Sequence, residues 1–418
     1  MFSNKDLRKL IIPLVIEQLL AVTIGMADTV MVSSCGEAAV SGISLVDSIN
    51  FLLITLFSSL ATGGAVIASQ YIGRGDHKSA SLAAKQLFYA SLALSAVLGV
   101  IAVFFRKPVL NMVFGSIEAD VMAHAQIYFL LSAISYPFLA VYNAGAALFR
   151  SMGDSRTTML ISILMNTINI VGNAILIYGF QMAAAGAATA SLVSRAVGAI
   201  IITVLLLNPR RIIFYDKLHK PEIHLSMLKS ILQIGVPNGL ENSIFQIGKI
   251  LVASIVSGFG TISITANAVA GNLASLQVIP GMALGMAMIT VVGQCIGAKD
   301  YEAVKKYTKK LMLITYGVVW AMTLLMLLFS KQILSFYSLS EETTTMTMEV
   351  FIVHGICAVI VWPLAFALPN ALRAANDVRF TMIVSLLSMW IFRIGFGYLL
   401  AKYLGMGVMG VWIAMYID

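Results

Sequence analysis

The chain has 418 residues, of which 59% are hydrophobic and 11% charged, and its mean hydropathy is +0.92. Soluble domains are about 45–50% apolar and about 25% charged, so this composition excludes a water-soluble globular protein. It also excludes disordered and collagen-like chains, which need polar or Gly/Pro-dominated sequence. The formal net charge of +8 could indicate nucleic acid binding, but only the positions of the basic residues along the chain can decide this. The composition predicts a polytopic membrane protein.

A membrane-spanning helix needs about 20 apolar residues. The first apolar run follows a short basic N-terminus and is too long for the apolar part of a signal peptide. No run shows the alternation of a membrane β-barrel strand. We therefore expect an all-α protein with twelve transmembrane helices. The predicted segments are 10–33, 42–72, 86–105, 121–148, 158–179, 184–207, 231–257, 264–296, 311–329, 350–372, 380–401 and 406 onward.

The Lys and Arg residues divide unequally between the two sides of this arrangement. The links on the N-terminal side hold 20 of them, the opposite links hold 4, and three (Arg195, Lys249 and Arg393) fall inside predicted helices. Basic residues are retained in cytoplasmic links. The bias predicts a cytoplasmic N-terminus, and it accounts for the positive charge without a nucleic acid partner.

The sequence contains an internal repeat. Four groups of residues recur in order at an offset of 223 or 224, which predicts two six-helix lobes, 1–207 and 231–418, joined by a basic link, 208–230. Because six is even, both lobes enter from the same side, and their symmetry axis lies along the membrane normal. The recurring groups are Pro13 and Glu17 with Pro237 and Glu241, residues 69–76 with 293–300, Arg150 and Asp154 with Arg373 and Asp377, and Gly186 with Gly410.

The offset also makes a prediction about the last helix. The sixth helix ends near residue 207, so its counterpart should end near about residue 431, beyond Asp418. We expect the twelfth helix to be incomplete in this sequence.

Charged residues within apolar helices are expensive and indicate function. Asp28 is the most informative of them, because its counterpart at the 224 offset is Val252 and the repeat therefore does not require it. A carboxylate in the bilayer interior favours its neutral form, so it can load a proton or bind a cation in its place. The alternative is an acid near a helix end that reaches water or pairs with Arg195.

The fifth predicted helix carries Asn166, Asn169 and Asn173 on one face, since residues three and four apart are helical neighbours. Amide oxygens suit a hard cation such as Na⁺. Hydrogen bonding between helices is an equally good explanation of the stripe. Ser191 and Ser194 follow a run of small residues in the sixth helix, which permits close packing against the fifth.

In the second half, Glu241, Lys249 and Arg393 form either a charge-compensated network or a wall facing the substrate. The equivalent positions of Glu17 and Glu241 favour a scaffolding role for both. Prolines such as Pro13 interrupt several helices and can act as hinges or as fixed bends. Met residues and aromatic residues such as Tyr136 would suit an adaptable cavity.

Segments 26–33, 70–76 and 150–154, with the repetition of the last two, resemble the multidrug and toxic compound extrusion (MATE) transporters over the whole chain. The resemblance implies a V-shaped pair of lobes that exports organic cations in exchange for H⁺ or Na⁺. It places the coupling ion at Asp28.

The resemblance also assigns further residues of the coupling-ion site. Asn169, Asn173 and Ser191 complete it, and Asn143 lies in the same region. A Na⁺ ion would bind at Asp28, Asn169 and Asn173. Many relatives carry an aspartate at the position of Asn173, so its absence here leaves the choice between H⁺ and Na⁺ open. The resemblance links Pro13 to bending of the first helix.

These observations predict a monomeric inner-membrane antiporter for small cationic compounds, with no cofactor besides its coupling ion. The alternative is a lipid-linked oligosaccharide or lipid flippase of the same superfamily, which would need a cavity rich in Arg and Lys. An enzyme is not expected, because the five histidines form no HExxH motif. The absence of a P-loop argues against an ATP-driven pump, and three distant cysteines without a CxxC argue against a disulfide framework or a structural zinc site. The residues predicted to line the substrate cavity or gate it are Pro13, Glu17, Tyr136, Glu241, Lys249 and Arg393.

Overall fold

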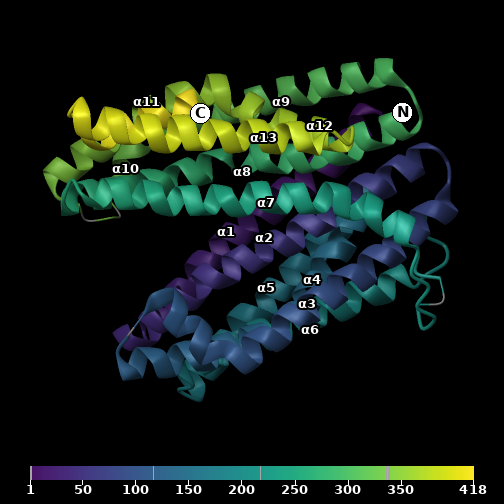
Figure 1. Ribbon diagram of the computed structural model, residues 1–418, viewed down its shortest axis with the longest axis horizontal. Helices are drawn as coiled ribbons and strands as arrows, with labels where there is room; N and C mark the ends of the chain where they lie inside the picture. The colour runs from purple at the N-terminus through teal and green to yellow at the C-terminus, as the bar shows by residue number, and fades with distance from the viewer. Residues whose placement is uncertain (1, 116, 217, 336, 338) are drawn as a thin grey trace. The chain divides into compact units, whose positions relative to one another are not determined.

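The computed structural model describes the chain except residues 1, 116, 217, 336 and 338, and except the side chains of residues 24 and 26–29. The first half of the chain folds into six long helices and one π-helical segment, shown in purple to teal in Figure 1. These are α1 (Asn4–Ser33), α2 (Glu37–Gly73), α3 (His77–Phe114), α4 (Ala119–Ser151), α5 (Ser155–Asn173), η1 (Ala174–Gly179) and α6 (Ala183–Leu206).

The second half repeats this order with more interruptions, because π-helical segments divide two of its helices. Its elements are α7 (Leu225–Ser257), α8 (Thr261–Gly297), α9 (Tyr301–Leu328), α10 (Ser330–Ser335), α11 (Glu341–Trp362), η2 (Pro363–Ala367), α12 (Leu368–Ala374), α13 (Val378–Ser388), η3 (Met389–Phe396), η4 (Leu399–Tyr403) and α14 (Gly407–Ile417).

The prediction of an all-α polytopic membrane protein is confirmed. Each predicted segment is helical, and ten helices in the described part of the chain are long and apolar enough to cross a membrane. The short helix α10 lies outside the apolar runs, and nothing in the runs distinguishes the π-helical segments from the α-helix around them, so we predicted neither. Several helices extend well beyond their apolar runs: α9 begins at Tyr301, whereas its run begins at 311. Hydropathy marks the part of a helix that can cross the hydrocarbon, and the helix itself continues beyond that part.

The recurring polar motifs form turns between helices. Gly75 has a φ of 76°, and the next residue, Asp76, accepts a hydrogen bond from the backbone N–H of Ser79 over 3.0 Å, which caps α3. At the equivalent place Lys299 has a φ of 58°, and Asp300 caps α9. A left-handed residue ends one helix and an acidic N-cap begins the next. The motif is thus a helix–turn–helix connection.

Two recurring glycines allow a close approach between α2 and α8. A Cβ on Gly73 would overlap the carbonyl oxygen of Gln294, and a Cβ on Gly297 would overlap the carbonyl oxygen of Gln70. Neither atom has room to yield, because both are backbone. The internal repeat therefore retains glycine at these two positions for packing.

Proline has different effects in different helices. Helix α1 continues through Pro13, whereas α3 is kinked at Phe105, three residues before Pro108. Proline removes a backbone donor and its ring crowds the preceding turn, which explains the kink. We did not predict the Pro108 kink.

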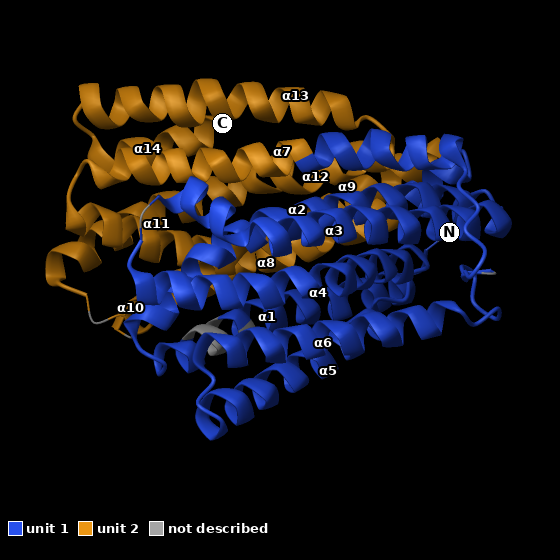
Figure 2. Ribbon diagram, turned by 60° about the horizontal axis from the view of Figure 1, so that its bottom comes forward, with its two compact units in different colours: residues 1–239, 293–299 blue, residues 240–292, 300–418 orange. Residues whose placement is uncertain are grey.

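Contacts between Cα atoms divide the chain into unit 1 (1–239 and 293–299) and unit 2 (240–292 and 300–418), coloured blue and orange in Figure 2. This division falls within α7 and α8. The lobe boundaries at 207 and 231 stay a prediction.

Each unit has its own apolar core. In unit 1, α2 packs along α3 and α4, α4 along α6, and α1 along α5 (Figure 1). A large cluster there joins α2, α3 and α4 around Phe57, Phe129 and Tyr136. In unit 2, Trp412 of α14 lies in a cluster with residues of α7, α8 and α11.

Candidate functional site

The polar side chains of α5 form a buried hydrogen-bonded chain with α6. Asn169 is 6% exposed and Asn173 is 1% exposed. The Asn173 amide donates to the Asn169 amide oxygen over 3.4 Å, and the Asn169 amide donates to the Ser191 hydroxyl over 3.0 Å. Three of the residues predicted for the coupling-ion site are therefore brought together inside unit 1.

Local sequence explains why these three side chains meet. Gly172 packs against Ala190, one residue before Ser191, so the two helix backbones approach closely. The π-helical segment η1 begins directly after Asn173. Such segments widen a helix locally and occur frequently at functional sites.

The two other asparagines considered in the sequence, Asn166 and Asn143, lie on α5 and α4. Asn166 donates to Ser162, one turn earlier on α5, over 3.3 Å. Asn143 is half-buried on α4, and its amide nitrogen has no hydrogen-bond partner within the described part of the protein. An unpartnered amide in a spanning helix is expensive.

The side chain of Asp28 lies outside the described residues. Its backbone belongs to α1, and α1 packs along α5, the helix that carries Asn169 and Asn173. The assignment of Asp28 to the coupling-ion site stays a prediction.

The polar cluster belongs to one half of the repeat only. At an offset of 223, the counterparts of Asn169 and Asn173 are Phe392 and Phe396, whose ring centroids are 5.4 Å apart. At an offset of 224, the counterpart of Ser191 is Met415. In unit 2, apolar side chains at the equivalent positions satisfy helix packing. Packing therefore does not require the polar side chains that unit 1 has there.

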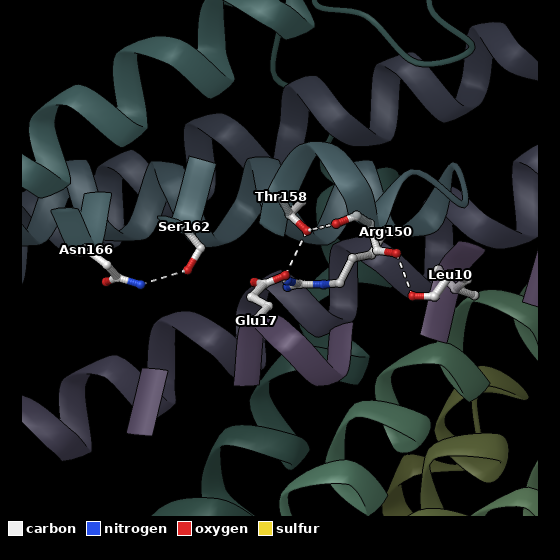
Figure 3. Close-up of polar contacts among 7 residues, drawn as sticks. Leu10, Glu17, Arg150, Thr158, Ser162 and Asn166 are labelled. Carbon is white, nitrogen blue, oxygen red and sulfur yellow. Dashed lines mark hydrogen bonds and ion pairs between the residues drawn. The ribbon is translucent and has the colours of Figure 1, made fainter. Parts of the chain in front are cut away.

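Glu17 and Glu241 make matching ion pairs in the two units. In Figure 3 the Glu17 carboxylate lies between Arg150, at 3.3 Å, and the Thr158 hydroxyl, which donates to it over 2.8 Å. Each of these side chains comes from a different helix, respectively α1, α4 and α5. The arrangement ties three helices together, which supports the scaffolding role expected from the repeat.

The unit 2 counterpart has the same chemistry. Arg373 lies 2.8 Å from Glu241, and the Ser385 hydroxyl donates to the same carboxylate over 2.9 Å. Both carboxylates are buried, Glu17 being 7% exposed and Glu241 9%.

A second polar network in unit 1 surrounds Asp47, which the sequence analysis did not place in a site. Asp47 is exposed within the spanning helix α2, and its carboxylate accepts hydrogen bonds from Tyr128, over 3.0 Å, and Asn50, over 3.2 Å. Tyr136 is fully buried and donates to the amide oxygen of Asn50 over 2.7 Å. The charge in an apolar run was visible in the sequence, but one of its two partners, Tyr128, lies on α4, 81 residues away.

Unit 2 holds a basic cluster around Phe245. The Arg393 guanidinium carbon lies 4.5 Å from the ring centroid and the Lys249 ammonium 5.3 Å. Arg393 is 4% exposed and forms an ion pair of 2.7 Å with Asp418. Lys249 is exposed. The predicted cavity residues Lys249 and Arg393 therefore contact one aromatic side chain, away from the Glu241 pair.

Comparisons with known proteins agree with this architecture. The family model described as MatE matches residues 13–175 and again 237–399, two intervals separated by the same 224 residues as the internal repeat. The uncharacterized transporter YisQ of Bacillus subtilis is 27% identical over 412 residues, which cover 97% of this chain and 89% of that protein.

A probable multidrug resistance protein NorM of Thermotoga maritima is 26% identical over 424 residues, covering 99% of this chain and 89% of that protein. A crystal structure of a MATE protein in complex with MaD3S superposes with a TM-score of 0.92 at 21% identity, covering 99% of this chain and 92% of that one. With the family model matched in both halves, the chain belongs to the MATE family of multidrug efflux transporters.

Proposed function

We propose that this protein is a secondary active antiporter that exports lipophilic organic cations in exchange for H⁺ or Na⁺. It acts as a monomer in the inner membrane, with its N-terminus in the cytoplasm. Membership of the MATE family supplies the efflux activity.

The hydrogen-bonded chain Asn173–Asn169–Ser191 carries the proposal. It is buried in a membrane-spanning unit, its oxygens are ligands of the kind that a hard cation prefers, and unit 2 has apolar residues instead. In the proposed site Asp28 supplies the negative charge from α1. A proton neutralises this carboxylate directly, whereas Na⁺ binds between it and the two amide oxygens.

Ion binding at Asp28 removes a charge from the bilayer interior and so changes the packing that α1 prefers. We expect α1 to bend at Pro13, where one backbone hydrogen bond is missing, and to reduce the space available to substrate in unit 1. Export then follows from competition, because the ion-loaded state binds the organic cation less well.

Asp47 is suited to the positive end of the substrate. Its carboxylate is exposed inside a spanning helix and is held by two neutral hydrogen-bond donors, and the charged group that interacts with it is Arg195. An acid oriented in this way attracts a desolvated cation strongly.

The test is transport of ethidium by purified protein in liposomes, under an imposed pH gradient and, separately, a Na⁺ gradient. The proposal expects one gradient to drive ethidium movement in the wild type, and Asp28→Asn to abolish it. Asp120→Asn is the matched control, because Asp120 is an exposed acid of the same unit in the first turn of α4, and it should transport normally. Wild-type rates in Asp28→Asn would overturn the mechanism.

A folded protein that moves ethidium under neither gradient would instead favour the flippase alternative. The same liposomes, loaded with a short-chain fluorescent phospholipid, would then show movement of the lipid between leaflets.

A further inference from the structure

Lys249 is a cation without a partner in a spanning helix. Within the described part of the chain it forms no ion pair and no hydrogen bond. It makes a cation–π contact with Phe245, whose ring centroid lies 5.3 Å from the Lys249 ammonium nitrogen. It lies eight residues before the end of the spanning helix α7. An exposed ammonium within a spanning helix is expensive unless it faces water or an anion.

The surroundings of Lys249 add positive charge. Arg393 lies over the same Phe245 ring, at 4.5 Å, and Asp418 is its ion-pair partner. Two cations thus share one aromatic ring, and of the two only Arg393 has an ion-pair partner among the described residues. Glu241 and Arg373 offer a contrast in the same unit, since that pair is balanced and buried.

The architecture of the lobes does not require a lysine at this position. At the 224 offset its counterpart in unit 1 is Gly25, where an added Cβ would meet no heavy atom within 4 Å. A helix of this fold therefore accommodates glycine at the equivalent place, and the lysine is specific to unit 2.

Exposed aromatic surface adjoins this charge. The Phe366 ring packs edge-on against Phe245, with centroids 5.9 Å apart, and stacks on Trp362 at 5.4 Å with an interplanar angle of 19°. Phe366 is 41% exposed. A flat aromatic face beside an unpaired ammonium is complementary to a planar apolar body that carries a negative group.

We propose that Lys249, Phe245 and Phe366 form a subsite in unit 2 for the carboxylate end of aromatic substrates. A single ammonium without an ion-pair partner matches a singly charged carboxylate better than a phosphate, which carries about −1.5 to −2 at neutral pH. The inference rests on the proposed efflux function and extends its substrates to compounds that bear an acid.

The test is binding of 1-pyrenebutyrate to purified protein in nanodiscs, followed by fluorescence anisotropy, with neutral 1-pyrenebutanol as the matched ligand. Lys249→Gln should raise the dissociation constant for the acid about tenfold and leave that for the alcohol unchanged. Lys249→Arg should keep the acid within about threefold of wild type. Phe366→Ala should weaken both ligands, because it removes the aromatic face.

Lys402→Gln is the control variant, since Lys402 is an exposed lysine of the same unit that lies 5.1 Å over Tyr398. Equal loss of both ligands in Lys249→Gln, an equal effect of Lys402→Gln, or no binding of the acid by the wild type would each overturn the subsite. Ethidium export by the wild type is measured in parallel. Its absence would count against the proposed function, whereas a charge-selective effect of Lys249→Gln on binding would still support the subsite.

Discussion

Gly172 of α5 and Ala190 of α6 lie so close that a Cβ added to Gly172 would be 2.9 Å from the Ala190 Cβ. The residues that follow them, Asn173 and Ser191, belong to the buried polar chain. We expect Gly172→Val to push the helices apart, to destabilise the protein by about 1–3 kcal/mol and to lose gradient-driven ethidium export. Thermal unfolding in detergent and the liposome assay measure the two effects.

Gly179→Val is the control for this substitution. Gly179 ends η1, and a Cβ there would meet no heavy atom within 4 Å. If both variants lose export to the same degree, close packing of α5 on α6 is not what the site requires.

Asn173→Asp tests the choice of coupling ion. A second carboxylate beside Asn169 adds attraction for a cation. A gain of roughly 1.4 kcal/mol in binding free energy raises the affinity for Na⁺ about tenfold. We expect the rate driven by a Na⁺ gradient to rise relative to the rate driven by a pH gradient. Asn166→Asp is the control, because it places the same charge elsewhere on α5, beside Ser162. It should leave the ratio of the Na⁺-driven rate to the pH-driven rate unchanged. A parallel fall of both rates in Asn173→Asp would contradict the expectation.

Glu17→Gln should destabilise unit 1 strongly. It removes one partner of a mostly buried ion pair and leaves Arg150 without its countercharge, a change that costs about 3–5 kcal/mol in comparable pairs. Glu302→Gln is the matched control, because Glu302 pairs with Lys305 at the same kind of distance, 3.2 Å, with side chains 86% and 77% exposed. The melting temperature should fall by several degrees in the first variant and stay unchanged in the second.

The cap of α3 predicts a dependence of stability on pH. Hydrogen bonds from the Ser79 side chain and backbone lower the pKa of Asp76 below the ordinary aspartate value. A lowered pKa in the folded state means that the stabilisation is present at neutral pH. It is lost as the pH falls below about 4 and through the folded-state pKa.

The variants of Asp76 make this visible. Asp76→Ala should melt at a lower temperature than wild type at pH 7, and the difference should shrink as the solution is acidified. Asp76→Asn keeps an acceptor for the cap without a titrating group, so its melting temperature should lie closer to wild type at pH 7. A difference between wild type and Asp76→Ala that is the same at pH 7 and pH 3 would show that the cap does not depend on ionisation.

Much of the fold could be predicted because lipid imposes a simple rule on the sequence. Every spanning segment must be a helix and must be apolar over the hydrocarbon, so apolar runs indicate helices directly. The helix ends were harder to predict: α11 begins at Glu341, nine residues before its apolar run, because the Ser340 hydroxyl accepts from the Thr343 N–H and starts the helix in the polar interface.

The candidate site could be predicted only in part. Asn169 and Asn173 share a helical face, so their proximity follows from the periodicity of a helix. That Ser191 meets Asn169, or that Tyr128 meets Asp47, depends on contacts between different helices. Helical periodicity relates residues within one segment and gives no rule for such pairs.

The sequence by itself determined that this is a membrane protein of two repeated halves. Spanning the hydrocarbon requires apolar runs, and the internal repeat places similar residues at a constant offset, so both features can be read along the chain. The tertiary structure alone decided which charges are neutralised. Glu17 and Glu241 have an arginine from another helix, whereas among the described residues Lys249 has the face of Phe245 and a second cation beside it. The energy of a charge depends on its three-dimensional neighbours at distances of a few ångströms, and those neighbours are set by how helices pack.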